Sequence, residues 1–254
     1  MNTSSLATQL FSLQGRRALV TGAGRGIGSA IASGLASFGA DVIIHDLTAE
    51  RCVSTCHAIQ ADGGTCSTIG LDLGEPDAGQ KLIETAGPID ILIINASAQI
   101  NGEIQTIDDE DFSTQVAVNL RSTVKMLQAC LPQMAAKGWG RVVSIGSINQ
   151  SRPKPIVTMY AATKAAQHNI IQSLARQYAR QGVLLNTLAP GLIDTDRNAE
   201  RRDADPDGWS NYVENLNFMG RAGAAQELVG AAVFLSSEAC SFMTGETIYM
   251  TGGF

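Results

Sequence analysis

Seven short apolar segments alternate with longer helix-like stretches along almost the whole chain. The apolar segments are RALVTG, DVIIHD, TCSTIGLD, IDILIINA, GRVVSIGS, VLLNTLAP and ETIYM. The helices expected between and after them cover 26–38, 48–61, 76–86, 107–137, 156–180 and 224–236. Strands that alternate with helices form a parallel sheet with helices on both faces. The sequence therefore predicts an α/β fold, a doubly wound Rossmann-type domain with a seven-stranded parallel sheet.

No Pro/Gly/Ser-rich linker or block of like charges interrupts this alternation. We therefore interpret 1–254 as a single domain, with 1–11 as an N-terminal extension. The segment 191–220 has no regular pattern and exceeds the ~12 to 15 residues of an ordinary loop, so we expect it to be a substrate lid. Thr106 is the expected N-cap of the helical region 107–137, because Asp109 follows three residues later.

Composition and charge argue against several classes of function. The net charge is −6 and there is no run of Lys or Arg, so we expect neither nucleic acid nor a membrane as a partner. No segment approaches the ~18 apolar residues of a membrane span and no signal sequence is evident, which predicts a cytoplasmic protein. The five cysteines lack a C-x-x-C pair, so we expect a reducing compartment and no disulfide framework. Cys52, Cys56 and His57 lack a second pair of ligands, so we expect no metal. The charge argument against nucleic acid and membranes leaves a small-molecule substrate as our expectation.

A glycine-rich turn, TGAGRGIG from Thr21 to Gly28, follows the first strand and opens the first expected helix. Glycine permits close approach of the backbone to a ligand, and a helix N-terminus presents free N–H groups to a phosphate. The turn therefore suits the pyrophosphate of a dinucleotide. Its glycines are Gly22, Gly26 and Gly28 in place of the common G-x-G-x-x-G pattern, which would need glycine at Ile27. A turn that serves only tight packing is the alternative interpretation.

Asp46 ends the second strand about 20 residues beyond the glycine turn, where a carboxylate can accept both ribose hydroxyls of NAD. It would repel the 2′-phosphate of NADP, and Leu47 offers that phosphate no positive charge. Arg25 in the glycine turn favours NADP weakly. We therefore expect NAD as the cofactor, with NADP as the alternative.

From about Ser12 onward the chain resembles the classical short-chain dehydrogenase/reductase family. The resemblance rests on TGAGRGIG, Asp72 after the third strand, Asn119 in the long helical region, Ser147 after the fifth strand, YAATK and NTLAPG. Tyr-x-x-x-Lys alone is common by chance, but here Ser147 also stands thirteen positions before Tyr160. After the fourth strand the family usually has Asn-Asn-Ala-Gly, and this chain has Ile94, Asn95, Ala96 and Ser97. We expect this departure to change the wall of the cofactor pocket.

Tyr160 and Lys164 are four positions apart, which places both on one face of a helix. Lys164 and the positive nicotinamide ring should lower the pKa of the Tyr160 phenol from its ordinary value near ~10. The resemblance implies that Tyr160 exchanges the proton of the alcohol and that Ser147 hydrogen-bonds the reacting oxygen. It also implies that Lys164 holds ribose hydroxyls, that Asn119 positions a water linking Lys164 to solvent, and that the protein is a homotetramer. Each of the four residues, Asn119, Ser147, Tyr160 and Lys164, has an ordinary structural role as its alternative.

The segment after the sixth strand resembles the family's nicotinamide pocket, with Ile193 and Thr195 expected at the carboxamide. The residues expected to bind the cofactor are Gly22, Arg25, Gly26, Ile27, Gly28, Asp46, Asp72, Leu73, Asn95, Ala96, Tyr160, Lys164, Pro190, Gly191, Ile193 and Thr195.

The residues expected around the substrate are rich in directional hydrogen-bonding groups. They are Ser97, Ser147, Asn149, Gln150, Tyr160 and Asn198, with Gln99, Arg152 and Arg201 as further candidates. Unpaired polar groups in a closed pocket are costly, so this lining favours a sugar, polyol or sugar acid over a long acyl chain. The alternative is that many of these side chains face water.

Two other functions stay open at this point. A 3-oxoacyl thioester reductase would have the same fold and catalytic residues, and Lys137 and Arg141 would give modest support for docking an acidic carrier protein. A catalytically idle dinucleotide-binding regulator would be expected to lack a catalytic residue.

Overall fold

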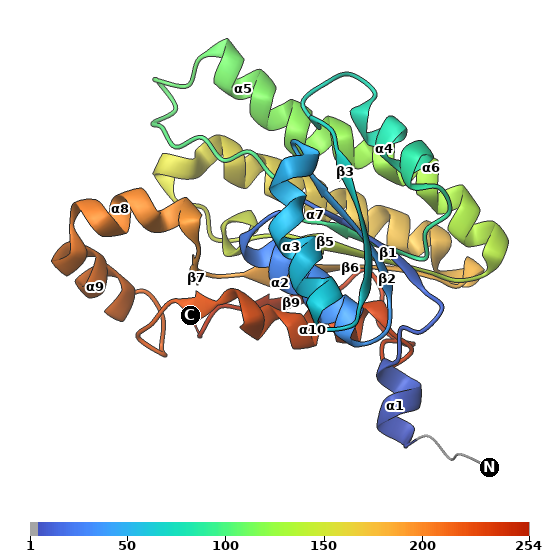
Figure 1. Ribbon diagram of the computed structural model, residues 1–254. Coiled ribbons are helices and arrows are strands. Elements are labelled where there is room, and N and C mark those ends of the chain that lie inside the picture. Colours follow the sequence, from blue (N-terminus) through green and yellow to red (C-terminus); the bar gives the residue numbers. More distant parts are fainter. Residues whose placement is uncertain (1–4, 254) are drawn as a thin grey trace.

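A seven-stranded parallel sheet forms the centre of the molecule, with helices on both of its faces (Figure 1). The computed structural model describes residues 5–253. The strand order β3-β2-β1-β4-β5-β6-β9 reverses between β1 and β4, so a crevice opens at the carboxyl ends of these strands. The predicted doubly wound α/β fold is confirmed. The strands are β1 (Arg17–Thr21), β2 (Asp41–Asp46), β3 (Thr65–Gly70), β4 (Ile91–Ile94), β5 (Gly140–Ile145), β6 (Val183–Pro190) and β9 (Thr247–Met250).

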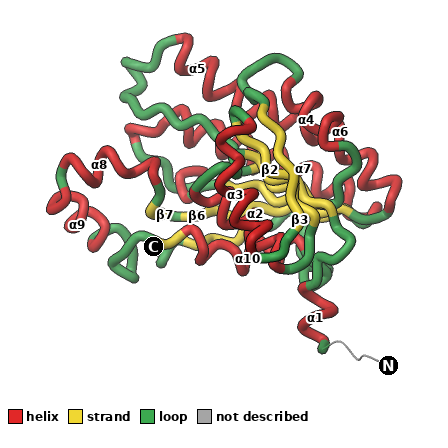
Figure 2. Tube along the Cα trace, in the orientation of Figure 1, coloured by secondary structure: helices red, strands yellow, loops and turns green. Residues whose placement is uncertain are grey.

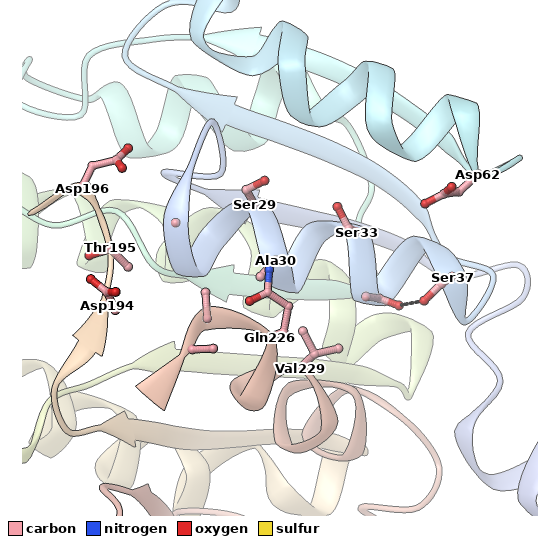
Figure 3. A pocket seen from close by; sticks show the side chains of 14 residues that line it. Ser29, Ala30, Ser33, Ser37, Asp62, Asp194, Thr195, Asp196, Gln226 and Val229 are labelled. Carbon is pink, nitrogen blue, oxygen red and sulfur yellow. Dashed lines mark hydrogen bonds between the residues drawn. The ribbon is translucent and has the colours of Figure 1, made fainter. Parts of the chain in front are cut away.

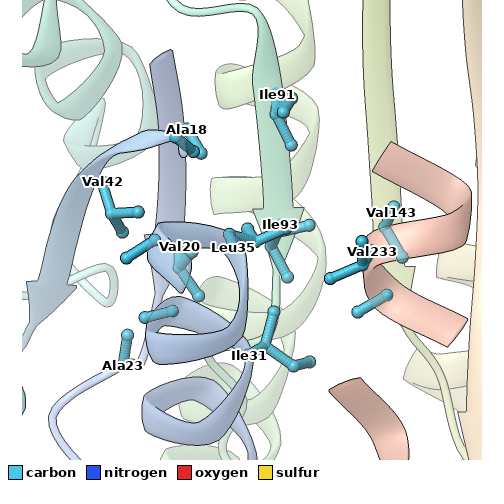
Figure 4. Close-up of a cluster of buried hydrophobic side chains, with 14 of the residues drawn as sticks. Ala18, Val20, Ala23, Ile31, Leu35, Val42, Ile91, Ile93, Val143 and Val233 are labelled. Carbon is cyan, nitrogen blue, oxygen red and sulfur yellow. The ribbon is translucent and has the colours of Figure 1, made fainter. Parts of the chain in front are cut away.

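Two clusters of buried apolar side chains, one on each face of the sheet, hold the layers together. One face is covered by α2 (Gly26–Ser37), α3 (Ala49–Ala61) and α10 (Val229–Ser236), and the other by α4 (Ala78–Ala86), α6 (Ser122–Lys137) and α7 (Thr158–Tyr178). Successive side chains of a strand point to opposite faces, so Val20 joins the first cluster and Leu19 the second. This double burial explains the continuous apolar runs in the sequence. Figure 4 labels members of the first cluster: Ala18, Val20, Ala23, Ile31, Leu35, Val42, Ile91, Ile93, Val143 and Val233.

The helical region expected at 107–137 contains a π-helical segment. It consists of α5 (Asp109–Val116), a π-helix (Ala117–Arg121) and α6. The prediction of Thr106 as N-cap is wrong, because Asp108 accepts the hydrogen bond from the backbone N–H of Asp111 at 2.8 Å. Thr106 instead donates its hydroxyl to the carbonyl of Glu103. The π-helix places Asn119 in the interior.

The segment 191–220 is more regular than its sequence indicated. It contains β7 (Ile193–Asp194), which pairs with β8 (Gly223–Ala224), and the short helices α8 (Ala199–Ala204) and α9 (Pro206–Glu214). Figure 2 shows α8 and α9 as two helices that project beside the sheet. The N-terminal extension also contains a helix, α1 (Leu6–Phe11), and residues 1–4 lie outside the described part of the chain.

The cysteines differ from the expectation at one pair. Cys56 of α3 and Cys66 of β3 form a disulfide, with their Cα atoms 5.9 Å apart. The chain turns from α3 directly into the neighbouring strand, which brings both side chains within reach of a bridge. This single bridge was not predicted from the sequence, which indicated no disulfide framework and a reducing compartment. Cys52, Cys130 and Cys240 are free and buried.

The amino-terminal edge of the sheet, opposite the glycine turn, carries a cluster of charged and aromatic side chains. The guanidinium carbons of Arg16 and Arg141 lie 3.6 and 4.4 Å from the centroid of the Trp139 ring. Glu238 accepts a hydrogen bond from the Trp139 indole N–H at 2.8 Å and pairs with Arg16 at 3.2 Å. These contacts bind the start of β1 and β5 to the segment after α10, far from the crevice.

Candidate active site

The glycine turn is held in shape by contacts that only glycine permits. Gly22 has a φ of +63°, and a Cβ there would lie 2.9 Å from the Cα of Ala96. A Cβ on Gly28 would lie 2.3 Å from the carbonyl oxygen of Gly22, so this glycine packs the turn and does not line the crevice. Asn95 braces the same turn, because its side-chain amide donates to the carbonyls of Thr21 and Gly22, both at 2.9 Å. The Asn95 that survives in the altered motif thus supports the turn.

The space beside the turn fits a dinucleotide phosphate. A Cβ on Gly26 would come no closer to another group than 3.5 Å, the distance to the Thr195 methyl carbon. A Cβ there would already be in van der Waals contact with Thr195, so the space between the two residues exists because Gly26 has no side chain. The first N–H groups of α2 border this space. All of the expected cofactor residues except Gly28 line this crevice, which is continuous with the catalytic residues and has a volume of about 650 Å³.

Asp46 does not have the free carboxylate that the sequence indicated. Its Oδ2 accepts the backbone N–H of Gly24 at 3.1 Å and its Oδ1 accepts that of Leu47 at 2.8 Å. Arg51 of α3 lies 3.7 Å from Oδ1 and lines the same end of the crevice. Because Asp46 is engaged and partly neutralised, this geometry does not support the expected preference for NAD. Arg51 was missed because a basic residue in a surface helix is usually only solvated.

The four expected catalytic residues come together at the carboxyl end of β5 and the start of α7. Ser147 follows β5, and its hydroxyl lies in a hydrogen bond with the Tyr160 phenol. Lys164, one turn beyond Tyr160 on α7, has its Nζ 5.9 Å from the centroid of the Tyr160 ring. Lys164 donates to the carbonyl of Ile145 at 2.7 Å. Ser147 also caps a short helix by accepting the N–H of Asn149 at 3.1 Å, so its structural and catalytic interpretations are compatible.

The chain by itself does not produce the expected electrostatics at Tyr160. Burial raises the pKa of the Tyr160 phenol, and the positive charge of Arg197 and the hydrogen bond with Ser147 only oppose this effect. Burial, helped by repulsion from Arg197, lowers the pKa of Lys164 to about 7. The predicted lowering of the Tyr160 pKa by Lys164 is therefore wrong for the chain alone. Arg197 is the protein cation that favours the phenolate, and nothing in its sequence position separates it from the other residues of 191–220.

Asn119 lies behind the crevice and is fully buried. Its side chain exchanges two hydrogen bonds with the backbone of Ala98, at 2.8 and 2.9 Å, and donates to Thr163 of α7 at 2.9 Å. It therefore fixes the strand exit that follows Ser97 against the catalytic helix.

Five of the six expected substrate residues line the crevice: Ser97, Ser147, Asn149, Tyr160 and Asn198. The prediction for Gln150 is wrong, because its Oε1 turns back to accept the N–H of Ser147 at 3.3 Å and completes a capping box. The side-chain amide of Asn198 is partly engaged within the protein, because it donates a hydrogen bond to the carbonyl of Ile193 at 2.8 Å.

Three cations line the substrate end of the crevice: Lys154, Arg197 and Arg201. Within residues 5–253, no carboxylate lies within ion-pair distance of any of them. At the other end, by contrast, Arg25 pairs with Asp196 and Arg51 with Asp46. Arg201 is among the residues expected around the substrate, whereas Lys154 and Arg197 are not.

Two of these cations meet at one aromatic ring. Lys154 donates to the hydroxyl of Tyr212 at 2.6 Å, and the guanidinium carbon of Arg201 lies 4.0 Å from the centroid of that ring. Tyr212 belongs to α9, so this contact joins the segment 191–220 to the loop that precedes α7. Two positive charges held at the same ring favour an anion in their neighbourhood.

A second cavity, of about 710 Å³, lies along α2 on the other side of Thr195 (Figure 3). Its wall includes Ser29, Ser33 and Ser37 on α2 and the carboxylates of Asp62, Asp194 and Asp196. It contains no basic side chain and none of the catalytic residues, so it is not the reaction site. Among the described residues, no three His, Cys, Asp or Glu side chains gather as a metal site, and no helix has the length and apolar character needed to cross a membrane.

Known proteins similar to this chain share its whole fold. The family model of the short chain dehydrogenases matches residues 16–206. Gluconate 5-dehydrogenase of Gluconobacter oxydans is 39% identical over 248 residues, which cover 96% of each chain. A 3-oxoacyl (acyl-carrier-protein) reductase from Agrobacterium tumefaciens, solved with NADP bound, is 59% identical over 100% of both chains, with a TM-score of 0.98. A gluconate 5-dehydrogenase from Burkholderia cenocepacia, solved with NADP and tartrate, is 33% identical over 97% of both chains, with a TM-score of 0.89.

Proposed function

Because this chain belongs to the short-chain dehydrogenase family and is a nicotinamide-dependent oxidoreductase acting on CH–OH groups, we propose that its substrate is a sugar acid. The three unpaired cations at the substrate end, Lys154, Arg197 and Arg201, carry this proposal. In a protein with a net charge of −6, three cations without acidic partners suit an anionic ligand. Two relatives named as gluconate 5-dehydrogenases support a carboxylate substrate.

An unpartnered acceptor supports a substrate that also has hydroxyl groups. The side-chain oxygen of Asn149 is buried and has no hydrogen-bond donor among the described residues. Asn149 lines the crevice beside Ser147. A buried acceptor without a partner is costly, and a substrate hydroxyl would satisfy it.

In the proposed mechanism, the bound nicotinamide supplies or accepts the hydride. Tyr160 takes the proton of the alcohol in oxidation and returns it in reduction. Ser147 donates a hydrogen bond to the reacting oxygen, where negative charge develops. Lys164 holds the ribose hydroxyls, and Asn119 keeps the Ala98 backbone in place beside the site. Gly22, Gly26, Asn95 and Thr195 would hold the rest of the dinucleotide.

NADP(H) is the dinucleotide that we propose. Arg25 and Arg51 line the end of the crevice beyond Asp46, whose carboxylate is turned toward the glycine turn. A 2′-phosphate can exchange their weak exposed ion pairs for charge-assisted hydrogen bonds. The two solved relatives described above hold NADP, which supports the same choice.

A 3-oxoacyl thioester reductase is the second candidate, because the Agrobacterium relative has that name. Lys137 and Arg141, which were expected to support docking of an acidic carrier protein, are both engaged within the protein. Arg141 is buried against Trp139, and the Lys137 ammonium is bonded to Asp90. Both residues lie at the amino-terminal edge of the sheet, opposite the crevice. An idle regulator is not favoured, since all four catalytic residues are present.

The remaining proposals concern the whole protein. We keep 191–220 as a substrate lid, supported by its two crevice-lining arginines, Arg197 and Arg201. A single domain, a cytoplasmic location and a homotetramer are supported by the family resemblance. Light scattering of the purified protein tests the tetramer directly.

A substrate screen tests the proposed function. Absorbance of the reduced cofactor is followed with D-gluconate, 5-keto-D-gluconate, sorbitol and a 3-oxoacyl thioester. The acids should give the highest kcat/KM, and Arg201→Ala and Lys154→Ala should raise their KM by about 10- to 100-fold, the value of a charged hydrogen bond. Arg202→Ala is the matched control, because Arg202 pairs with Asp194 and Asp203 and should leave KM unchanged. A higher kcat/KM for the thioester than for the acids would refute the sugar-acid proposal.

A further inference from the structure

A buried glutamine lies between Lys164 and Asn119. Gln167 is 1% exposed and sits one turn beyond Lys164 on α7. Its Oε1 accepts a hydrogen bond from the Lys164 ammonium at 3.1 Å. Its Nε2 donates to the backbone carbonyl of Asn119 at 3.2 Å and to the hydroxyl of Thr123 at 2.8 Å. Every polar atom of this amide is therefore engaged, and the amide bridges the catalytic lysine to the π-helix.

The bridge occupies the place where a water was expected. The family resemblance implies a water that Asn119 positions between Lys164 and solvent, and here the side chain of Gln167 bonds to both the Lys164 ammonium and the backbone carbonyl of Asn119. We propose that Gln167 is a positioning residue that replaces this water and holds Lys164 in its catalytic place. The inference rests on the proposed role of Lys164 and is independent of the identity of the substrate.

The chemistry of an amide changes the path of the proton. A water accepts a proton on one side while it releases another, but the Gln167 Oε1 has no proton to release. Protonation of that oxygen with loss of a proton from Nε2 would leave the amide in its unfavourable imidic form. In alcohol oxidation the proton taken up by Tyr160 must then leave on the other side. The Tyr160 hydroxyl then gives this proton to solvent water that enters the crevice, whose wall there includes Ser97 and Arg197. In reduction the proton returns by the same path.

Three charged or titratable groups define the pH dependence of this arrangement. Tyr160 faces Lys164 from the same helix and Arg197 faces it from the lid segment. Gln167 itself is uncharged, and its oxygen stabilises the ammonium form of Lys164. Removal of that oxygen should make Lys164 lose its proton at lower pH, and a carboxylate in its place should have the opposite effect.

Three substitutions separate positioning from packing. Gln167→Leu keeps the volume and removes the acceptor, Gln167→Glu keeps an acceptor and adds a charge, and Gln167→Ala opens space for a water. Such a water would have three partners, the groups that Gln167 now contacts. Gln172→Leu is the matched control, because Gln172 lies on the exposed side of the same helix and its side-chain amide bonds to the carbonyl of Gly245.

The variants are compared by their kcat–pH profiles, with the best substrate of the screen, and by the pH dependence of NADPH affinity, which needs no substrate. We expect Gln167→Leu to lower kcat by about 10- to 100-fold and to move the alkaline limb to lower pH, whereas Gln167→Glu moves it to higher pH. Gln167→Ala should be faster than Gln167→Leu, because a water restores the acceptor. Gln172→Leu should match the parent.

Three results would overturn the proposal. The first is a Gln167→Leu variant with kcat within twofold of the parent and an unmoved alkaline limb. The second is an alkaline limb that moves in the same direction for Gln167→Leu and Gln167→Glu. The third is a Gln167→Ala variant no faster than Gln167→Leu, which would contradict the idea that Gln167 replaces a water. Failure of the screen to favour sugar acids would leave these readouts unchanged, so the two proposals fail separately.

Discussion

Lys164→Met tests whether burial of the Lys164 ammonium lowers the free energy of unfolding of the protein. Burial lowers the pKa of Lys164 from 10.5 to about 7. Between these values the unfolded chain binds this proton and the folded protein does not, so the stability contributed by Lys164 rises with pH across the window. At ~1.4 kcal/mol per pKa unit, the whole window corresponds to about 5 kcal/mol, and the step from pH 7 to pH 9 to about 2 kcal/mol.

Urea unfolding of the parent and the variant at both pH values measures this cost. Methionine fills similar space without a charge, so Lys164→Met should be the more stable protein at pH 7, and its advantage should shrink by about 2 kcal/mol at pH 9. Lys81→Met, at an exposed position of α4, is the control, and its difference from the parent should not change with pH. All proteins are compared at one concentration, because assembly also stabilises the folded state. A constant advantage of Lys164→Met, or one that grows with pH, would refute the reasoning.

Three further predictions concern chemistry, cofactor choice and motion. Tyr160→Phe should retain NADPH affinity within about twofold and lower kcat by about 10²- to 10⁴-fold; single-turnover hydride transfer at the parent rate would contradict the proton role. Arg51→Gln should weaken NADPH binding by about 10-fold or more and leave NADH binding unchanged in a fluorescence titration, whereas equal effects on both would place the 2′-phosphate elsewhere. Limited proteolysis should cut within 191–220, and cofactor plus substrate should slow the cut more than cofactor alone; equal cleavage in all three states would indicate a passive segment.

The central strands of the sheet were predictable because they are buried on both faces. Val20 and Leu19 pack into opposite clusters, so most positions of such a strand are apolar and the run is visible in the sequence. The glycine turn was predictable for a related reason, since the contacts of Gly22 and Gly28 exclude a side chain.

The direction of polar side chains could not be predicted in the same way. Asp46 bonds to the backbone of Gly24, which only the tertiary fold brings near, and Gln150 turns back to the backbone of Ser147 three residues earlier instead of toward the crevice. Thr106 and Asp108 are both suitable caps, and their choice depends on where the chain turns into α5. Gln167 reads as one more polar residue of an amphipathic helix, and nothing in its spacing indicates that Lys164 and Asn119 converge on it.

The Arg16–Trp139–Arg141 cluster has a consequence for how such an enzyme can change over evolution. It anchors the sheet at the edge opposite the crevice, while the residues proposed to contact the substrate lie at the strand exits and in the segment 191–220, at the other edge. Exchanges among Lys154, Arg197 and Arg201 therefore leave that anchor untouched. Substitutions among the crevice-lining residues can therefore change the substrate preference of one ancestral fold without first lowering its stability. This fits the two differently named activities among its relatives.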